Sequence, residues 1–89
     1  LMSRIPPFMK NLENLVHLHL NDCDLDDIPD WISSFKELGL LSVKDNNISA
    51  LPKSMKKLKN LSVIELQDNP INSVPGYLKK LNKQANINF

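Results

Sequence analysis

Apolar residues recur along the chain with a fixed spacing, and this spacing predicts how the protein is built. Leu15, Leu38 and Leu61 lie 23 residues apart. The same spacing relates further apolar columns, which are Leu18, Leu41 and Ile64; Leu20, Val43 and Leu66; Met2, Leu25, Ile48 and Ile71; Ile5, Ile28, Leu51 and Val74; Met9, Ile32, Met55 and Leu78; and Leu12, Phe35, Leu58 and Leu81. Such a period indicates an array of stacked units, because each unit can bury its apolar face only against the next.

Each unit combines a short alternating stretch with a run that begins at a proline. Alternate side chains of an extended strand point to opposite faces, so Leu18 and Leu20 are expected to point inward while His17 and His19 point outward. The prolines fix φ and remove a backbone donor, and amphipathic runs follow them. These runs predict short helical or 3₁₀ segments over residues 30–37, 53–59 and 76–83. We therefore expect an α/β solenoid with a parallel sheet on its concave side and helical segments on its convex side.

The columns indicate that the 89 residues form a single domain, and they divide it into three full repeats and two partial ones. The repeats cover 15–37, 38–60 and 61–83, with partial repeats at 1–14 and 84–89. Terminal repeats of a solenoid normally need a polar cap, and neither end shows a cysteine-rich flank or an amphipathic capping helix. Two expectations follow: a piece of a longer protein, or a short array that shields its ends by self-association.

A polar column follows the strand of each repeat. Asn46 and Asn69 occupy it in the second and third repeats, and Cys23 occupies it in the first. Short amide side chains can hydrogen-bond turn backbone that would otherwise be buried without a partner, whereas a thiol does so only weakly. This column is therefore expected to stabilise the turn after each strand.

The repeat reads LxxLxLxxNxLxxLPxxIxxLxx, and it resembles the leucine-rich repeat. The resemblance rests on LENLVHLHLNDCDLDDIPDWISSFKEL, LGLLSVKDNNISALPKSMKKLKNL and LSVIELQDNPINSVPGYLKKL. The 23-residue length with LPxxI is similar to an intracellular subclass found in Ras-binding scaffolds, in Scribble- and Erbin-type polarity proteins and in many bacterial proteins. Cys23 departs from the usual Asn, and Gln84 interrupts the leucine column, which suggests that the array weakens there. The resemblance implies a leucine-rich-repeat solenoid, a horseshoe arc, and small GTPases, kinases or phosphatases as partner classes.

Cysteine content predicts an intracellular, cytoplasmic protein. An extracellular array of this size would carry disulfides at its ends, but Cys23 is the single cysteine. No segment resembles a signal peptide or a membrane span.

The net charge of +1 conceals an uneven distribution. Residues 1–37 contain three basic and seven acidic side chains, whereas residues 38–89 contain eight and three. Most of the lysines fall in the convex runs without interleaved aromatic residues, which argues against nucleic acid as a partner. Head-to-tail contact between two molecules would bring these opposite charges together.

The outward positions of the predicted strands form columns across the sheet, and we interpret them as a protein-binding surface. Leu40 and Val63 place two apolar side chains together on a face that the period alone leaves polar, which favours an interface anchor. The alternative is two ordinary exposed residues. The complete predicted set is His17, His19, Asn21, Asp22, Leu40, Ser42, Lys44, Asp45, Val63, Glu65, Gln67 and Asp68.

The column of Asp22, Asp45 and Asp68 has two interpretations. Like charges on neighbouring strands repel, so the column can receive a basic partner or a cation. Alternatively, these aspartates hydrogen-bond local backbone and assist the turn.

Metal binding and catalysis find little support. His17 and His19 have a spacing that two zinc ligands can use, but the strand beside them offers no further ligand; a pH-sensitive contact through these histidines fits better. Cys23 has no activating basic neighbour, and two glycines make no phosphate loop. We expect a non-enzymatic protein-interaction module without cofactor or metal. The alternative is a structural spacer or self-assembly element that stacks through its end repeats.

Overall fold

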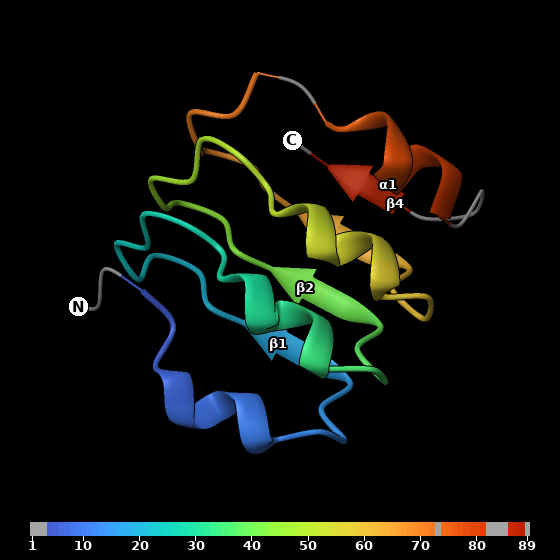
Figure 1. The fold of residues 1–89 in the computed structure, drawn as a ribbon. Helices are drawn as coiled ribbons and strands as arrows, with labels where there is room; N and C mark the ends of the chain where they lie inside the picture. Colours follow the sequence, from blue (N-terminus) through green and yellow to red (C-terminus); the bar gives the residue numbers. More distant parts are fainter. Residues whose placement is uncertain (1–3, 73, 82–85, 89) are drawn as a thin grey trace.

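The computed structural model describes residues 4–72, 74–81 and 86–88. Four short parallel strands alternate with short helical segments, and the two kinds of element form two layers of one curved array (Figure 1). In chain order the elements are η1 (Pro7–Asn11), β1 (His17–His19), η2 (Asp30–Ser34), β2 (Leu40–Ser42), η3 (Lys53–Lys57), β3 (Val63–Glu65), α1 (Gly76–Leu81) and β4 (Asn86–Asn88). Consecutive strands are neighbours in the sheet, in the order β1-β2-β3-β4. The predicted α/β solenoid is confirmed.

The register of the sheet follows the 23-residue period. His17 pairs with Leu40, Leu40 with Val63, and Val63 with Asn86. The middle residues of the strands pair in the same way, and Leu18, Leu41 and Ile64 are buried. A parallel sheet in this register places equivalent residues of successive repeats side by side, so the apolar columns of the sequence become continuous rows of the core.

The core lies between the sheet and the helical layer. The side chains of Leu25, Ile32, Phe35, Leu38, Leu41, Val43, Ile48, Met55, Leu58 and Leu66 are fully buried there. Burial of one such side chain contributes about 1.5–3 kcal/mol. Four members of the columns, Met9, Leu15, Leu51 and Ile71, are only partly buried, and they pack against the core.

The convex segments are shorter than the sequence predicts. Instead of residues 30–37 and 53–59, the 3₁₀ turns cover Asp30–Ser34 and Lys53–Lys57. Each turn ends because the next residue, Phe35 or Leu58, has ψ near 70° and inserts its side chain into the core. The run at 76–83 is the α-helix Gly76–Leu81, and its last two predicted residues lie outside the described residues, as do Gln84 and Phe89.

The asparagine column performs the predicted role and also joins repeats. The Asn46 Oδ1 accepts hydrogen bonds from the backbone N–H groups of Cys23 (3.0 Å) and Leu25 (2.9 Å) of the preceding repeat. Its Nδ2 donates to the carbonyl oxygens of Leu20 and Val43, both at 2.9 Å. One buried amide thus satisfies backbone groups of two neighbouring repeats at once.

In the part of the chain that the structure describes, no helix has the length and apolar character needed to cross a membrane.

Candidate protein-binding face

Six of the twelve predicted site residues belong to the strands and alternate with the buried Leu18, Leu41 and Ile64; they are His17, His19, Leu40, Ser42, Val63 and Glu65. The other six follow the ends of the strands. The six strand residues lie on the sheet face opposite the helical layer, which we call the concave face. Its rows run across the strands: His17, Leu40, Val63 and Asn86 form one row, and His19, Ser42, Glu65 and Asn88 form the next. The predicted columns are therefore present. Accessibility divides the twelve predicted residues: the side chains of His17, His19, Asn21, Asp22, Asp45 and Asp68 are exposed, and those of Leu40, Lys44, Val63, Glu65 and Gln67 are half-buried.

Leu40 and Val63 form an apolar pair at the start of the two middle strands of this face. They are direct partners across strands β2 and β3, and each keeps part of its side chain accessible. The next residues along the strands, Leu41 and Ile64, point into the core and are buried. The strand alternation thus separates one apolar pair that faces outward from the apolar residues that hold the fold together.

Ser42 differs from the expectation that it is available to a partner. Only 1% of it is exposed, because the Asn21 side chain of the preceding repeat lies against it. The Ser42 hydroxyl donates to Asn21 Oδ1 at 2.8 Å, and the Lys44 backbone N–H donates to the same oxygen at 2.7 Å. The Ser42 hydroxyl and the Asn21 side-chain oxygen Oδ1 therefore hydrogen-bond each other, and they join strand β2 to the chain that follows strand β1.

The three aspartates of the predicted acidic column share an unusual backbone conformation. Asp22, Asp45 and Asp68 have φ of 53°, 58° and 62°, in the left-handed region that asparagine and aspartate tolerate better than other non-glycine residues. The backbone N–H of Asp22 donates to the Lys44 carbonyl at 2.8 Å. This geometry assigns the aspartates a role in the turn, and it leaves their carboxylates exposed to solvent.

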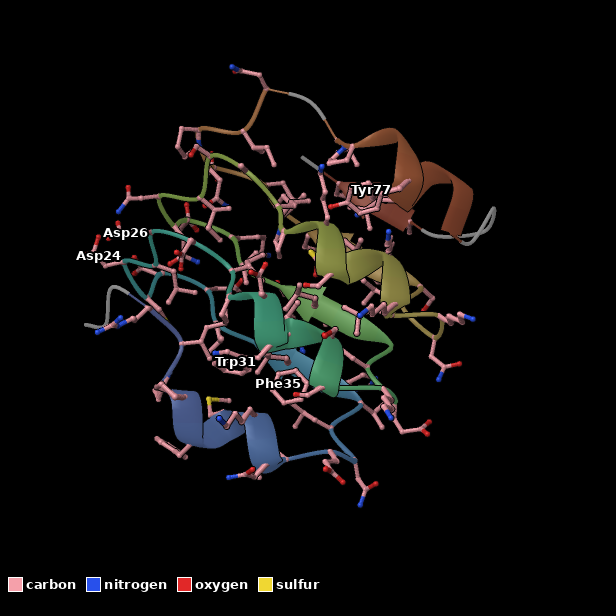
Figure 2. The ribbon with its side chains drawn as sticks, in the orientation of Figure 1. Asp24, Asp26, Trp31, Phe35 and Tyr77 are labelled. Atoms are coloured by element: carbon pink, nitrogen blue, oxygen red, sulfur yellow. The ribbon has the colours of Figure 1, made fainter. Side chains whose placement is uncertain are left out.

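A fourth aspartate extends the acidic edge. Asp24 also has positive φ, 60°, and its Oδ1 accepts a hydrogen bond from Asn47 Nδ2 at 2.8 Å. Asp24 and Asp26 project from the edge of the molecule, far from Trp31 and Phe35 in the convex layer (Figure 2). Negative charge therefore gathers where the chain leaves the strands.

Gln67 has a polar atom for which the described residues provide no partner. Its Oε1 is shielded from solvent and accepts no hydrogen bond from residues 4–72, 74–81 or 86–88. The residue lies in the same row as Asn21 and Lys44, and its side chain as a whole is half-buried. An unpaired buried acceptor costs about 1–3 kcal/mol, so this oxygen marks a place where a donor would be favourable.

The possible metal and thiol chemistry gains no geometric support. Among the described residues, no three His, Cys, Asp or Glu side chains converge in a way that could hold a metal ion. Cys23 is half-buried, its N–H donates to Asn46, and its Sγ donates to the Asn21 carbonyl at 3.3 Å. Cys23 therefore occupies the turn position of its column and has contacts that stabilise the turn.

Sequence reasoning missed a set of polar contacts between the convex segments. The Ser54 hydroxyl donates to the Asp30 carbonyl at 2.7 Å, and the Tyr77 hydroxyl donates to the Pro52 carbonyl at 2.7 Å. Trp31 packs edge-on against Phe35, with ring centroids 5.9 Å apart. The signal was present in the sequence, since residues 31, 54 and 77 share the 23-residue spacing.

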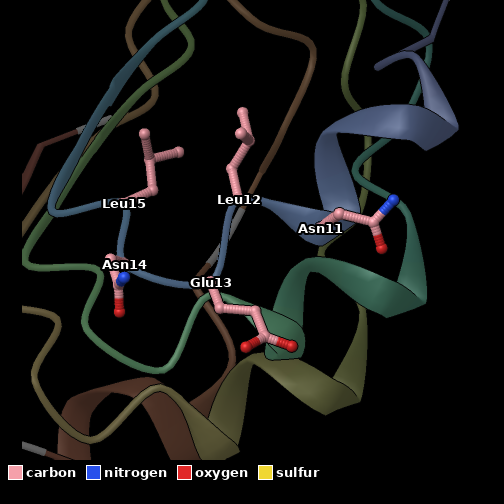
Figure 3. Close-up of a pocket in the computed structure, with 5 residues that line it drawn as sticks. All are labelled: Asn11, Leu12, Glu13, Asn14 and Leu15. Atoms are coloured by element: carbon pink, nitrogen blue, oxygen red, sulfur yellow. The ribbon is translucent and has the colours of Figure 1, made fainter.

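A pocket of about 350 Å³ lies at the other end of the array from β4. Five consecutive residues, Asn11, Leu12, Glu13, Asn14 and Leu15, line it (Figure 3). Only one of them, Glu13, is ionisable, so the pocket brings together no group of side chains that could perform chemistry.

Comparisons with known proteins agree with the geometry. The family model of the Leucine Rich Repeat matches residues 14–35. The structure of a leucine-rich-repeat protein from Leptospira interrogans is similar over 98% of this chain, with a TM-score of 0.84 and 33% sequence identity. This chain spans 22% of the length of that protein. A comparison with curated proteins gave no match. The repeat pattern, the sheet register and these similarities show that the chain adopts the fold of a leucine-rich-repeat solenoid.

Proposed function

We propose that the chain is a protein-interaction module that binds a protein partner through its concave face. The observation that carries this proposal is the apolar pair of Leu40 and Val63, which stays partly accessible on the two middle strands of that face. Polar residues surround it: His17 on one side, Glu65 and Lys44 further along the strands. Interfaces commonly consist of such an apolar centre within a polar rim.

A structural spacer or self-assembly role is the second candidate. It has one observation in its favour: Phe8, Leu12 and Val16, which precede strand β1, are 72%, 47% and 50% exposed. Phe35 and Leu58, the counterparts of Leu12 in the next two repeats, are fully buried. This candidate gives no reason for an apolar pair on the concave face, so we place it second.

The partner classes and the cellular location remain part of the proposal. Small GTPases, kinases and phosphatases are the partners that the resemblance to the intracellular LPxxI subclass suggests, and the single cysteine supports a cytoplasmic location. Under this proposal the chain itself binds and performs no catalysis, and it requires no cofactor.

Comparative affinity capture tests the proposal. The chain is immobilised beside the double variant Leu40→Asp/Val63→Asp, and the retained proteins are quantified by mass spectrometry. We expect the double variant to lose specific partners, because two charges replace the apolar pair of the face.

A second variant, Ser49→Asp/Ala50→Asp, serves as the control. It adds the same two charges at exposed positions outside the strands, and it should retain the partners. Circular dichroism establishes that both variants fold. If the Leu40→Asp/Val63→Asp variant retains the same partners as the unmodified chain, the concave face is not the binding surface.

A further inference from the structure

The concave face separates its apolar and its charged residues into different rows. The apolar pair, Leu40 and Val63, lies at the start of strands β2 and β3. The acidic row, which we define as Asp22, Asp45 and Asp68, follows the ends of the strands by three residues. Five residues separate Leu40 from Asp45, a distance of at most about 17 Å along an extended chain.

Negative charge dominates this face. The acidic row and Glu65 provide four carboxylates, whereas Lys44 is the one lysine or arginine among the predicted site residues, which also include the imidazoles of His17 and His19. Strands lie about 4.8 Å apart, so successive carboxylates of the row repel one another across the sheet. The lysines of residues 53–57 belong to the convex segment η3 and are on the other layer of the molecule.

Gln67 gives an independent indication of the chemistry that this face lacks. Gln67 lies along the chain between Val63 and Asp68, and its Oε1 accepts no hydrogen bond from the part of the chain that the structure describes. A partner that satisfies this oxygen must bring an N–H or O–H donor. Lysine and arginine provide such donors together with a positive charge, whereas a carboxylate or a phosphate provides neither.

We propose that the concave face receives an extended, basic segment of a protein partner. An apolar side chain of the segment rests on Leu40 and Val63, and lysine or arginine side chains about five residues away contact Asp45 and Asp68. This inference rests on the proposed function and adds the chemical class of the partner. Nucleic acids and acidic proteins are disfavoured, because their charges repel the acidic row.

Two synthetic peptides of equal length test the inference. Each carries one leucine, with two charged residues placed four and six positions after it, on the same side of an extended peptide as the leucine. The charged residues are arginine in one peptide and glutamate in the other. Fluorescence anisotropy of the labelled peptides measures their binding to the full chain. We expect the arginine peptide to bind and the glutamate peptide not to bind, and we expect higher salt to weaken the binding.

Neutralising the acidic row identifies the contact. In the variant Asp45→Asn/Asp68→Asn, asparagine tolerates the same positive φ, so the turns are retained. We expect it to bind the arginine peptide roughly three- to tenfold more weakly, which corresponds to two exposed ion pairs. The matched control Asp26→Asn/Asp27→Asn removes the same charge from exposed residues outside the row, and its affinity should be unchanged.

Three results would overturn the inference: no binding of the arginine peptide, equal binding of the glutamate peptide, or an equal loss in the control variant. The capture experiment with Leu40→Asp/Val63→Asp separates this failure from failure of the proposed function. If that variant loses its partners while the arginine peptide does not bind, the face binds proteins of another charge. If the variant keeps its partners, the proposed function itself fails.

Discussion

At the scale of single residues, Asn46 shows how one side chain holds two repeats together. Its amide joins the backbone of the turn after β2 to the backbone of the preceding repeat, and the residue is buried. The neighbouring Asn47 is exposed, and it makes a side-chain hydrogen bond to Asp24. The two asparagines are adjacent in sequence, but buried backbone groups depend on the Asn46 side chain for their hydrogen bonds, whereas the Asn47 side chain is exposed.

Replacing Asn46 by alanine should therefore lower the free energy of unfolding by about 2–4 kcal/mol, because several buried backbone groups lose their partner. Urea denaturation followed by circular dichroism measures the change. Asn47→Ala is the control, and we expect it to change stability by about 0.5 kcal/mol or less. Equal effects of the two substitutions would show that the buried amide is unimportant.

The positive φ of Asp45 leads to a second prediction. Valine is branched at Cβ and is strained in the left-handed region, so Asp45→Val should destabilise the fold by about 1–2 kcal/mol. Asp45→Asn should be close to neutral, since asparagine tolerates this conformation. Thermal unfolding of both variants checks the difference, and equal melting temperatures would be incompatible with the φ of 58°.

Residue-level features also mark the limit of prediction from sequence. The columns predicted which residues share a row, because the side-chain period of a strand and the repeat length are fixed. They did not predict that Asn21 hydrogen-bonds Ser42 and covers it, since this contact depends on the direction of one flexible side chain. The sequence also did not predict the positive φ of Asp22, Asp45 and Asp68, although Asp at three equivalent positions indicated a role in the turn.

At the scale of elements, the positions of strands and convex segments followed the sequence, but their lengths did not. An amphipathic run indicates where a helical turn begins, directly after Pro29 or Pro52, and apolar spacing alone suggests that it continues through Phe35 or Leu58. The turns end earlier, because the side chains of Phe35 and Leu58 enter the core and the backbone leaves the helical region at these residues. Packing thus ends the segments before their sequence pattern does.

Tyr77 connects α1 to the neighbouring convex segment, and it makes this contact sensitive to pH. Burial raises the pKa of its hydroxyl above the usual 10.0. The unfolded chain therefore loses this proton first, so the contribution of Tyr77 is complete below pH 10 and is lost as pH rises through the folded-state pKa. Because Tyr77 is the single tyrosine, absorbance reports its titration without overlap from another tyrosine.

We expect Tyr77→Phe to be less stable at neutral pH by about 0.5–1.5 kcal/mol, since the hydrogen bond to the Pro52 carbonyl is lost. The stability difference between the variant and the unmodified chain should shrink above pH 10. Denaturation at pH 8 and at pH 11 measures it. A difference that stays constant between these two values would contradict the raised pKa.

At the scale of the whole molecule, stability comes from stacking rather than from any single repeat. Phe35 and Leu58 are fully buried between repeats, whereas the equivalent Leu12 is 47% exposed. Each repeat buries its apolar side chains against the neighbouring repeats. The stability of an interior repeat therefore depends on the repeats on both sides of it.

This dependence predicts a large difference between two phenylalanines. Phe35→Ala should cost about 3–5 kcal/mol, the usual value for a large side chain removed from a core. Phe8→Ala should change stability by about 0.5 kcal/mol or less, because Phe8 is 72% exposed. Urea midpoints of the two variants make the comparison, and a comparable loss for Phe8→Ala would mean that its ring is covered in solution.

The central claim of this account is that the concave face binds a protein. Its most direct test is a map of amide chemical-shift changes in the ¹⁵N-labelled chain during titration with a partner retained in the capture experiment. We predict that the largest changes surround Leu40, Lys44, Val63 and Gln67 and that the convex segment Lys53–Lys57 is unaffected. Changes confined to the convex segments, with the strands unaffected, would contradict the claim.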